Sequence, residues 1–318
     1  MFKFIKLFQN IKKNKSLDNS YKNILKIENK IILINSHSNL NFTAGDTIMI
    51  SNYMNLLMKN NNFIYLLSIY EVGQNFKRNL EFENYKILKS DNNKKLIKLI
   101  DSLSTIVNII FIRNHLIINE LDNKNYSPKI IFYGLTYHLK DIKKLKNYLG
   151  IITQSKQLRK LYIKSGVSPK KIKIIEPFAY KYDFNLIKKK KDKIKLIYCG
   201  TLRKEENLFK LINEFKKIYK AKPEILLKII YGKIHGDINF QKKINNLIEN
   251  NVNGIIFKHN LSHRDTCFEI ASSDYGIFMR KNIRKNKIGL IYNGEISTKL
   301  KEYKLYKTKV INNLLVLK

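Results

Sequence analysis

The sequence predicts an α/β protein of two doubly wound domains, each built on a parallel sheet, and three observations support this prediction. First, short apolar segments rich in β-branched residues alternate with helical segments along the chain, which is typical of parallel strands covered on both faces. Second, 318 residues are long for a single hydrophobic core. Third, the charged segment KYDFNLIKKKKDK, residues 181–193, interrupts the alternation, and we interpret it as a linker between domains.

The first half is expected to contain a series of buried strands, each followed by a helix or a turn. The expected strands are IILINS (31–36), FIYLLSIYE (63–71), IVNIIFIR (106–113), KIIFYGL (129–135), LGIITQS (149–155) and KIKIIEP (171–177). The expected helices lie within residues 47–61, 95–103, 114–121, 141–148 and 157–166. This alternation predicts a Rossmann-like first domain.

The alternation restarts after the linker and predicts a second Rossmann-like domain. Its expected strands are KIKLIYCG (193–200), EILLKIIYG (224–232), GIIFKHN (254–260), YGIFMR (275–280) and KVI (309–311), with helices within 207–220, 240–251, 263–273 and 297–306. Two such domains leave a cleft between the carboxyl ends of their strands, where folds of this type bind ligands. We therefore divide the chain into a basic N-terminal segment (1–29), a first domain (30–185) and a second domain (186–318).

The formal net charge of +36 is not interpreted as a nucleic-acid footprint. Of the 61 basic residues only seven are arginine, and the lysines are spread along the whole chain rather than concentrated in a patch. The charge does suit an anionic membrane surface. In MFKFIKLFQNIKKNK, residues 1–15, apolar residues fall on one helical face, so this segment would lie in a membrane interface, dock on its own domain or form a frayed tail.

The two cysteines and the absence of a long apolar run restrict the compartment. Cys199 and Cys267 lie among apolar residues without partner spacing, which favours a reducing compartment and disfavours a disulfide framework or a structural zinc site. No apolar run approaches the ~20 residues of a membrane span, and lysines interrupt any signal-peptide core. The sequence thus predicts a cytoplasmic protein, with peripheral binding to the inner membrane face through the basic N-terminal segment.

A helix that begins near Ser297, in NGEISTKLKEY (293–303), offers a candidate anion site. Ser297 or Thr298 can cap its first turn, which leaves backbone N–H groups for an anion. Thr298 and Glu302 are four residues apart and share one face. A nucleoside diphosphate fits this pattern, with Glu302 accepting hydrogen bonds from ribose, but an ordinary capped surface helix fits it as well.

Several segments, in order and spacing, resemble the retaining glycosyltransferases of the GT-B fold, group 1 (family 4). In the second half they are YCGTLRKEENLFKLINEF, SDYGIFMRKN and NGEISTKLKEYKLYKTKVI, and in the first half AGDTIMISNYMNLLMKNN and LGIITQSKQLRKLYIKSGVSPKKIKIIEPFAYKYDF. The likeness covers most of residues 30–311. It implies a nucleotide-sugar donor bound by the second domain, a glycan or lipid-linked acceptor bound by the first, no metal and no other cofactor.

The resemblance also implies roles for residues of the donor site. The diphosphate would meet Gly200 and the backbone at Ser297 and Thr298, Lys299 is one of three alternative clamps for it, and Glu302 would bind the ribose. A helix N-terminus favours an anion by about 0.3–1 kcal/mol, which is independent support for this assignment.

Five further residues complete the predicted site. His138 follows the strand at 129–135 and would stand against the transferred sugar, while Arg203 and Arg280 are alternative clamps for the departing diphosphate. Gly45 would let its loop approach a sugar or phosphate, and Gly232 is expected in a strand-end turn facing the nucleotide base.

Some polar residues are not assigned to the site. We interpret His235, His259 and His263 as loop or cap residues whose spacing resembles no zinc site, and we place Asp265 and Glu269 on an exposed helix face. No Asp-x-Asp pair stands at a strand end, which disfavours a metal-dependent glycosyltransferase of the other common fold.

The chain departs from the family pattern at several positions. The family's Arg directly after the Gly is Thr201 here, its Lys six residues after the Gly is Glu206, and its Gly and Pro before the last strand are Lys307 and Lys309. The family normally continues past this strand, whereas the sequence stops at Lys318. Two functions therefore stay open: a hexosyl-type transferase of surface polysaccharide or glycoconjugate synthesis, or a catalytically inactive nucleotide- or glycan-binding remnant. Donor sugar, nucleotide, acceptor and oligomeric state are not readable from the sequence.

Overall fold

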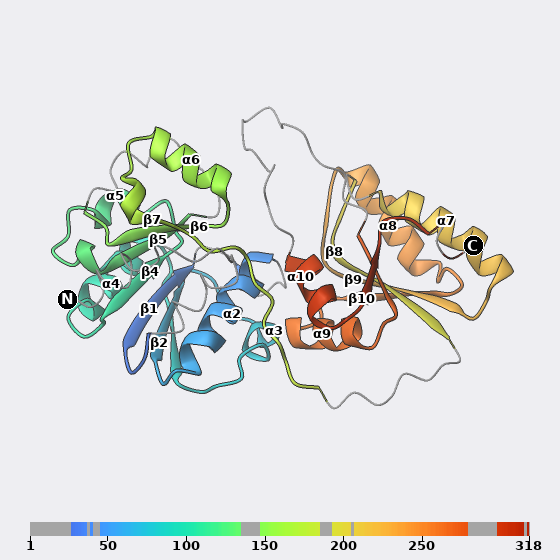
Figure 1. Ribbon diagram of the computed structural model, residues 1–318, viewed down its shortest axis with the longest axis horizontal. Helices are drawn as coiled ribbons and strands as arrows, with labels where there is room; N and C mark the ends of the chain where they lie inside the picture. Colours follow the sequence, from blue (N-terminus) through green and yellow to red (C-terminus); the bar gives the residue numbers. More distant parts are fainter. Residues whose placement is uncertain are drawn as a thin grey trace.

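The computed structural model of the chain describes residues 27–36, 39–40, 45–134, 147–184, 193–204, 207–278, 298–314 and 317. These residues form two α/β domains, one around a sheet within 31–174 and the other around a sheet within 194–311 (Figure 1). This architecture confirms the predicted fold class. The expected N-terminal amphipathic helix and most of the expected linker lie outside the described residues.

The first sheet contains seven parallel strands among the described residues, in the spatial order β3-β2-β1-β4-β5-β6-β7. They are β1 (Ile31–Ser36), β2 (Phe63–Ser68), β3 (Tyr85–Lys89), β4 (Ile109–Ile112), β5 (Ile130–Gly134), β6 (Gly150–Thr153) and β7 (Ile172–Ile174). Ile32 of β1 pairs with Ile64 of β2 on one side and Ile109 of β4 on the other. The direction in which strands are added therefore reverses between β1 and β4, the place where such sheets bind ligands.

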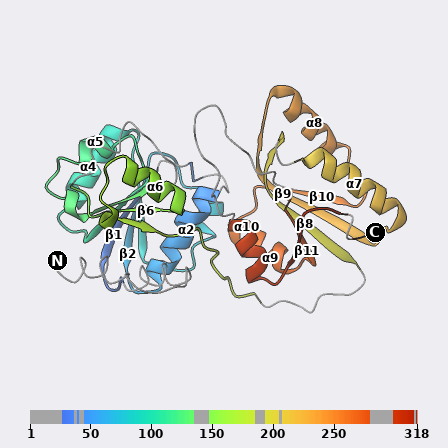
Figure 2. The ribbon, with the colours of Figure 1, turned by 45° about the horizontal axis from the view of Figure 1, so that its top comes forward.

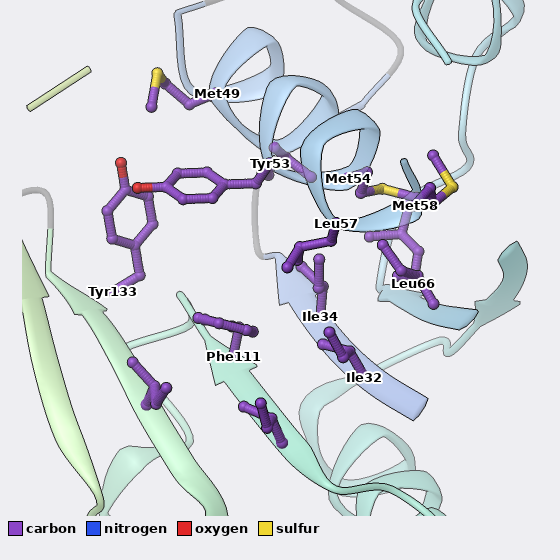
Figure 3. Packing of buried hydrophobic residues seen from close by; sticks show 14 of the residues in the cluster. Ile32, Ile34, Met49, Tyr53, Met54, Leu57, Met58, Leu66, Phe111 and Tyr133 are labelled. Carbon is purple, nitrogen blue, oxygen red and sulfur yellow. The ribbon is translucent and has the colours of Figure 1, made fainter. Parts of the chain in front are cut away.

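Both faces of this sheet are buried by helices, which is why its strands are almost continuously apolar (Figure 2). The helices are α2 (Gly45–Met58), α3 (Gln74–Lys77), α4 (Asn93–Leu103), α5 (Ile118–Leu121) and α6 (Lys156–Lys164), with 3₁₀ turns at Ser127–Lys129 and Pro169–Lys171. Ile32 and Ile34 of β1 pack against Met54 and Leu57 of α2 (Figure 3). Leu33 points to the other face, where α4 and α6 cover it. The helix expected at 114–121 is shorter than predicted.

The second sheet contains five parallel strands among the described residues, in the order β10-β9-β8-β11-β12. They are β8 (Ile194–Arg203), β9 (Ile225–His235), β10 (Ile255–His259), β11 (Tyr275–Ile277) and β12 (Lys309–Ile311). Helices α7 (Leu208–Ala221) and α8 (Ile238–Glu249) cover one face, and α9 (His263–Ala271) and α10 (Thr298–Leu305) cover the other. The winding reverses between β8 and β11. Of the helices that the structure describes, none has the length and apolarity needed to cross a bilayer.

Strands β8 and β9 extend further than the sequence predicted. Gly200 and Gly232 were expected to end their strands, but pairing resumes after an irregularity at Gly200 and continues to Arg203 opposite His235. Gly232 therefore lies inside β9 and not in a turn, which corrects its predicted placement. The residues that follow each glycine, TLR and KIH, are compatible with a strand, and the pairing of the two extensions stabilises both.

Helix α10 approaches the sheet closely because β11 carries a glycine beneath it. A β-carbon on Gly276 of β11 would lie 2.7 Å from ring atoms of Tyr303, so the aromatic ring rests directly on the strand backbone. Tyr303 is fully buried, together with Ile197, Cys199 and Ile270. This contact sets the distance between α10 and the sheet.

Glu269 corrects another expectation, since it is buried and ion-paired instead of standing on an exposed helix face. Its side chain on α9 is 11% exposed and lies 2.5 Å from the ammonium groups of both Lys228 on β9 and Lys258 on β10. Burial alone would raise the pKa of Glu269, but the hydrogen bonds and charges of the two lysines outweigh burial, so the pKa is lowered. The carboxylate therefore fastens α9 to the sheet.

We predict that Glu269→Gln destabilises the protein by about 2 kcal/mol at neutral pH, because two partly buried ammonium groups lose their counter-charge. A lowered folded-state pKa stabilises the fold above the unfolded-state pKa of about 4.3, and this contribution is lost as the pH falls through the folded-state pKa. Denaturant unfolding between pH 3 and pH 7 should therefore show a wild-type advantage that shrinks in acid.

The matched control for this prediction is Glu71→Gln, because Glu71 pairs with Lys89 on the surface with 74% of its side chain exposed. It should leave the unfolding transition unchanged. Equal effects of the two substitutions at pH 7 would contradict a structural role for the buried carboxylate.

Candidate functional site

The candidate donor site lies at the carboxyl edge of the second sheet, where the winding reverses between β8 and β11. Gly200 stands near this end of β8, and α10 begins above it at Thr298. The first turn of α10 contains Lys299 and no acidic residue. The positive charge of this lysine therefore adds to the positive end of the helix dipole at this edge. The arrangement is suited to an anion.

Lys299 and Gly200, which the sequence assigned to one site, are in direct contact. A β-carbon at position 200 would collide with Nζ of Lys299, so the missing side chain makes room for the ammonium group. Nζ also lies 5.8 Å from the ring centroid of Tyr198. Burial raises the pKa of the Cys199 thiol to about 12, while the charge of Lys299 acts to lower it. The ammonium group thus stands over the backbone of β8.

Glu302, one turn further along α10, is held by a histidine. Its residue surface is only 2% exposed, and its Oε1 lies 2.8 Å from Nε2 of His263. The ring nitrogen Nε2 therefore donates its proton to the carboxylate, and Oε2 has no hydrogen-bond partner among the described residues. His263 was expected in a loop or cap. It is instead a fully buried residue at the start of α9 and belongs to the site.

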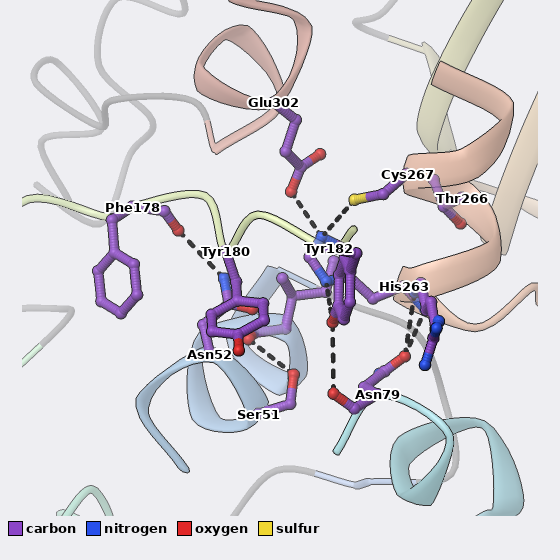
Figure 4. A network of polar contacts seen from close by, with 12 residues as sticks. Ser51, Asn52, Asn79, Phe178, Tyr180, Tyr182, His263, Thr266, Cys267 and Glu302 are labelled. Carbon is purple, nitrogen blue, oxygen red and sulfur yellow. Dashed lines mark hydrogen bonds and ion pairs between the residues drawn. The ribbon is translucent and has the colours of Figure 1, made fainter. Parts of the chain in front are cut away.

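The other side of the His263 ring faces the segment around Tyr180 and Tyr182, which leaves the first domain (Figure 4). Nδ1 lies 3.1 Å from the hydroxyl of Tyr182, and the two rings meet edge to face with centroids 5.5 Å apart. Burial raises the pKa of Tyr182, so its hydroxyl keeps its proton and can donate it to Nδ1. The backbone N–H of His263 donates to Oδ1 of Asn79 at 2.7 Å.

A metal could be held by three buried residues of this network. Nε2 of His263, Sγ of Cys267 and a carboxylate oxygen of Glu302 lie within 4.8 Å of one another, and this donor set suits zinc. The 2.8 Å between Nε2 and Oε1 is nevertheless a hydrogen-bond distance. It is shorter than the ~3.4 Å between two ligands of a tetrahedral zinc with bonds near ~2.1 Å. The observed geometry is that of a hydrogen-bond network, and metal independence stays a prediction.

A second group of buried polar atoms lies in the first domain, at the carboxyl edge between β1 and β5. A cavity of about 30 Å³ there is lined by Asn35, Tyr53, Arg113 and Tyr133 together with apolar side chains. The rings of Tyr53 and Tyr133 meet edge to face with centroids 5.3 Å apart, and their hydroxyls lie near one another (Figure 3). Burial raises the pKa of Tyr133 to about 12, which keeps the hydroxyl protonated. The cavity has room for a water molecule or a single polar group of a ligand.

The remaining predicted residues are less connected. Arg203 ends β8 in register with His235, three positions beyond Gly200, and Gly232 lies inside β9. Gly45 is the first residue of α2 and not part of the preceding loop. The structure does not describe His138, Arg280 and Ser297, so their predicted roles are untested.

Sequence reasoning missed Asn79, Tyr182 and His263, although one signal was available. His263 and Cys267 are four residues apart on α9 and share a face, and Cys267 was already expected in apolar surroundings. That spacing placed His263 on the buried face. No comparable signal marked Asn79 or Tyr182, because they reach the network through contacts more than 80 residues away along the chain.

Comparison with known proteins identifies the architecture. HepE from Anabaena, solved with UDP and glucose, matches 88% of this chain and 80% of its own with a TM-score of 0.57 and 12% identity. TarM from S. aureus matches 88% of this chain and 85% of its own with a TM-score of 0.57 and 10% identity. A glycosyltransferase from Rickettsia africae matches 89% and 79% with a TM-score of 0.56 and 15% identity.

The chain has the GT-B fold. No family model matches it, and no curated protein matches it in sequence. At identities of 10–15% the likeness to the solved structures concerns the fold alone. The function must therefore be argued from the site.

We predict that neither cysteine of the native protein reacts with a thiol reagent at pH 8. Burial raises the pKa of Cys199 to about 12 and raises that of Cys267 as well, so both side chains are protonated and inaccessible. Titration with Ellman's reagent should detect no free thiol in buffer and two per chain in urea. Rapid labelling of the native protein would contradict the dry network around Glu302.

Proposed function

We propose that the protein is a retaining, metal-independent glycosyltransferase of hexosyl type. It transfers a sugar from a nucleoside-diphosphate-sugar donor to a glycan or lipid-linked acceptor, in surface polysaccharide or glycoconjugate synthesis. The observation that carries the proposal is the placement of Lys299, the start of α10 and Glu302 together at the winding reversal of the second sheet. HepE, which shares the fold, was solved with UDP-glucose and with UDP.

The diphosphate would bind above Gly200, between the start of α10 and the ammonium group of Lys299. Backbone N–H groups and a helix dipole stabilise an anion there, and Lys299 adds a full charge at close range. The negative charge on the diphosphate grows as the bond to the sugar breaks. A fixed positive environment therefore stabilises the transition state more than the ground state.

The ribose would bind Glu302 through Oε2. Because His263 engages Oε1, the carboxylate is oriented before the ligand arrives, and its second oxygen can accept from the vicinal ribose hydroxyls. Little reorganisation is then needed on binding. In the proposed mechanism His138 contacts the transferred sugar, and Arg203 or Arg280 assists the leaving diphosphate.

The first domain would bind the acceptor. Asn35, Arg113 and Tyr133 at the carboxyl edge of its sheet, together with Tyr53 of α2, form a set of hydrogen-bonding groups suited to hydroxyls of a glycan. The basic N-terminal segment would hold the protein at the cytoplasmic face of an anionic membrane, where lipid-linked acceptors are found. Each lysine near such a surface contributes about 1 kcal/mol.

We predict that a nucleoside diphosphate stabilises the protein and that Glu302 and Lys299 are required. A ligand at a hundred times its Kd adds about 2.7 kcal/mol to the native state, which thermal unfolding detects. A panel of nucleoside diphosphates and nucleotide sugars, beginning with UDP and UDP-glucose, should contain at least one stabilising ligand. Glu302→Ala and Lys299→Ala should each reduce or abolish the shift.

The control is Lys304→Ala, which removes the same charge from the exposed end of the same helix. It should keep the full thermal shift, because the diphosphate binds at the opposite end of α10. If no nucleotide stabilises the wild-type protein, the proposed activity is wrong.

We also predict that sugar transfer persists when divalent cations are removed. Lys299 and the start of α10 supply the positive charge that a metal supplies in metal-dependent enzymes, so EDTA should leave the rate of UDP release unchanged. Loss of activity in EDTA, restored by Mg²⁺ or Mn²⁺, would contradict metal independence.

A further inference from the structure

His263 is the residue at which the first domain, the segment between the domains and the donor site meet. Its ring contacts Glu302 through Nε2 and Tyr182 through Nδ1, and its backbone contacts Asn79. Asn79 belongs to the first domain and Glu302 to the second, so a single side chain and its own peptide group connect them. Both Asn79 and His263 are buried, with exposures of 1% and 0%.

The contact with the first domain is built around the start of α9. Oδ1 of Asn79 accepts from the N–H groups of His263 and Arg264, at 2.7 and 3.3 Å. Its carbonyl oxygen accepts from the side chain of Asn55 on α2 at 2.7 Å, which ties the contact to the core of the first domain. The first two N–H groups of α9 therefore find their acceptor in the first domain, whereas the third, that of Asp265, donates to Oγ of Ser262 in its own domain.

The segment between the domains supplies the second restraint on the ring. The backbone N–H of Tyr182 donates to the hydroxyl of Tyr306 at 3.0 Å, and the Tyr182 ring packs with Tyr180 and Cys267. Its hydroxyl lies 3.1 Å from Nδ1 and 3.4 Å from the carbonyl oxygen of Asn79. The Tyr182 hydroxyl thus donates to Nδ1, which carries no proton of its own, and Nε2 carries the proton that Glu302 accepts.

We propose that His263 is a positioning residue that couples docking of the first domain to nucleotide binding by Glu302. Docking through Asn79 and Tyr182 sets the ring in the orientation and tautomer that hold Oε1 of Glu302, and this leaves Oε2 aimed for the ribose. The inference rests on the proposed function, because it concerns how the donor site is regulated. It adds that donor affinity depends on first-domain residues that do not touch the donor.

Two substitutions, each with an amide in place of one ring nitrogen, test the contacts of Nε2 and Nδ1 separately. The amide of glutamine replaces Nε2, so His263→Gln keeps a donor for Glu302. The amide of asparagine replaces Nδ1, so His263→Asn keeps the Tyr182 side and loses the carboxylate contact. With UDP as the probe in calorimetric titrations, His263→Asn should weaken binding about ten-fold, as expected for loss of a hydrogen bond to a charged group. His263→Gln should stay within about two-fold.

The coupling itself is tested with substitutions in the first domain. Asn79→Ala removes the acceptor at the start of α9 and should weaken UDP binding about five-fold, at the lower end of typical coupling energies. The matched control is Asn75→Ala, since Asn75 donates across the same interface to the Asn260 carbonyl oxygen at 2.6 Å but does not contact His263. It should change UDP affinity by less than about two-fold.

Reciprocity provides a readout that a merely structural role would not change. If docking promotes nucleotide binding, UDP must promote docking by the same factor. Hydrogen exchange of the first amides of α9 should therefore slow when UDP is added to the wild-type protein. The same slowing should be absent in His263→Asn at UDP concentrations that saturate the variant.

Each remaining outcome counts against the inference. Equal effects of Asn79→Ala and Asn75→Ala would show ordinary domain closure without a role for His263. Wild-type UDP affinity in a folded His263→Asn protein would overturn the coupling while leaving the proposed function intact. Absence of any nucleotide binding by the wild type would overturn both. One zinc ion per chain, lost in His263→Asn, would make Nε2 a metal ligand and overturn the hydrogen-bond mechanism.

Discussion

The close approach of α10 to the second sheet is the constraint on which the rest of the donor site depends. Gly276 lets the ring of Tyr303 rest on β11, and Gly200 leaves room for the ammonium group of Lys299 above β8. A side chain on Gly276 would push the helix outward, and a side chain on Gly200 would displace the ammonium group of Lys299 from the edge where the winding reverses. The absence of a side chain at Gly276 therefore positions α10 with Glu302, and its absence at Gly200 makes room for the ammonium group of Lys299.

Two buried glutamates of this very basic chain, Glu269 and Glu302, have different kinds of partner. Glu269 is balanced by two lysines and fastens α9, whereas Glu302 is held by a histidine through a single oxygen. A carboxylate fully neutralised by lysines is a structural element, because nothing is left for a ligand. A carboxylate with one oxygen engaged and the other without a described partner is suited to recognition, since desolvation is already partly compensated before the ligand binds.

The segment between the two domains is attached to both of them. Glu176 pairs with Lys301 of α10 at 3.0 Å, the hydroxyl of Tyr180 donates to Glu81 in the first domain, and Tyr182 contacts His263. A change in domain orientation would have to break or rearrange these contacts together. These contacts therefore connect the first domain to α9 and α10, the helices that carry the candidate donor residues.

The sequence by itself determined the fold class, because strand-length apolar runs alternating with helices leave a doubly wound parallel sheet as the consistent solution. The resemblance of its segments to GT-B glycosyltransferases also assigned Gly200, Lys299 and Glu302 to one region. Only the tertiary structure decided that Gly232 lies inside a strand, that Glu269 is buried and that His263 holds Glu302. These three findings depend on the pairing of β8 with β9 and on contacts between residues distant along the chain. Neither can be inferred from the local periodicity of the sequence.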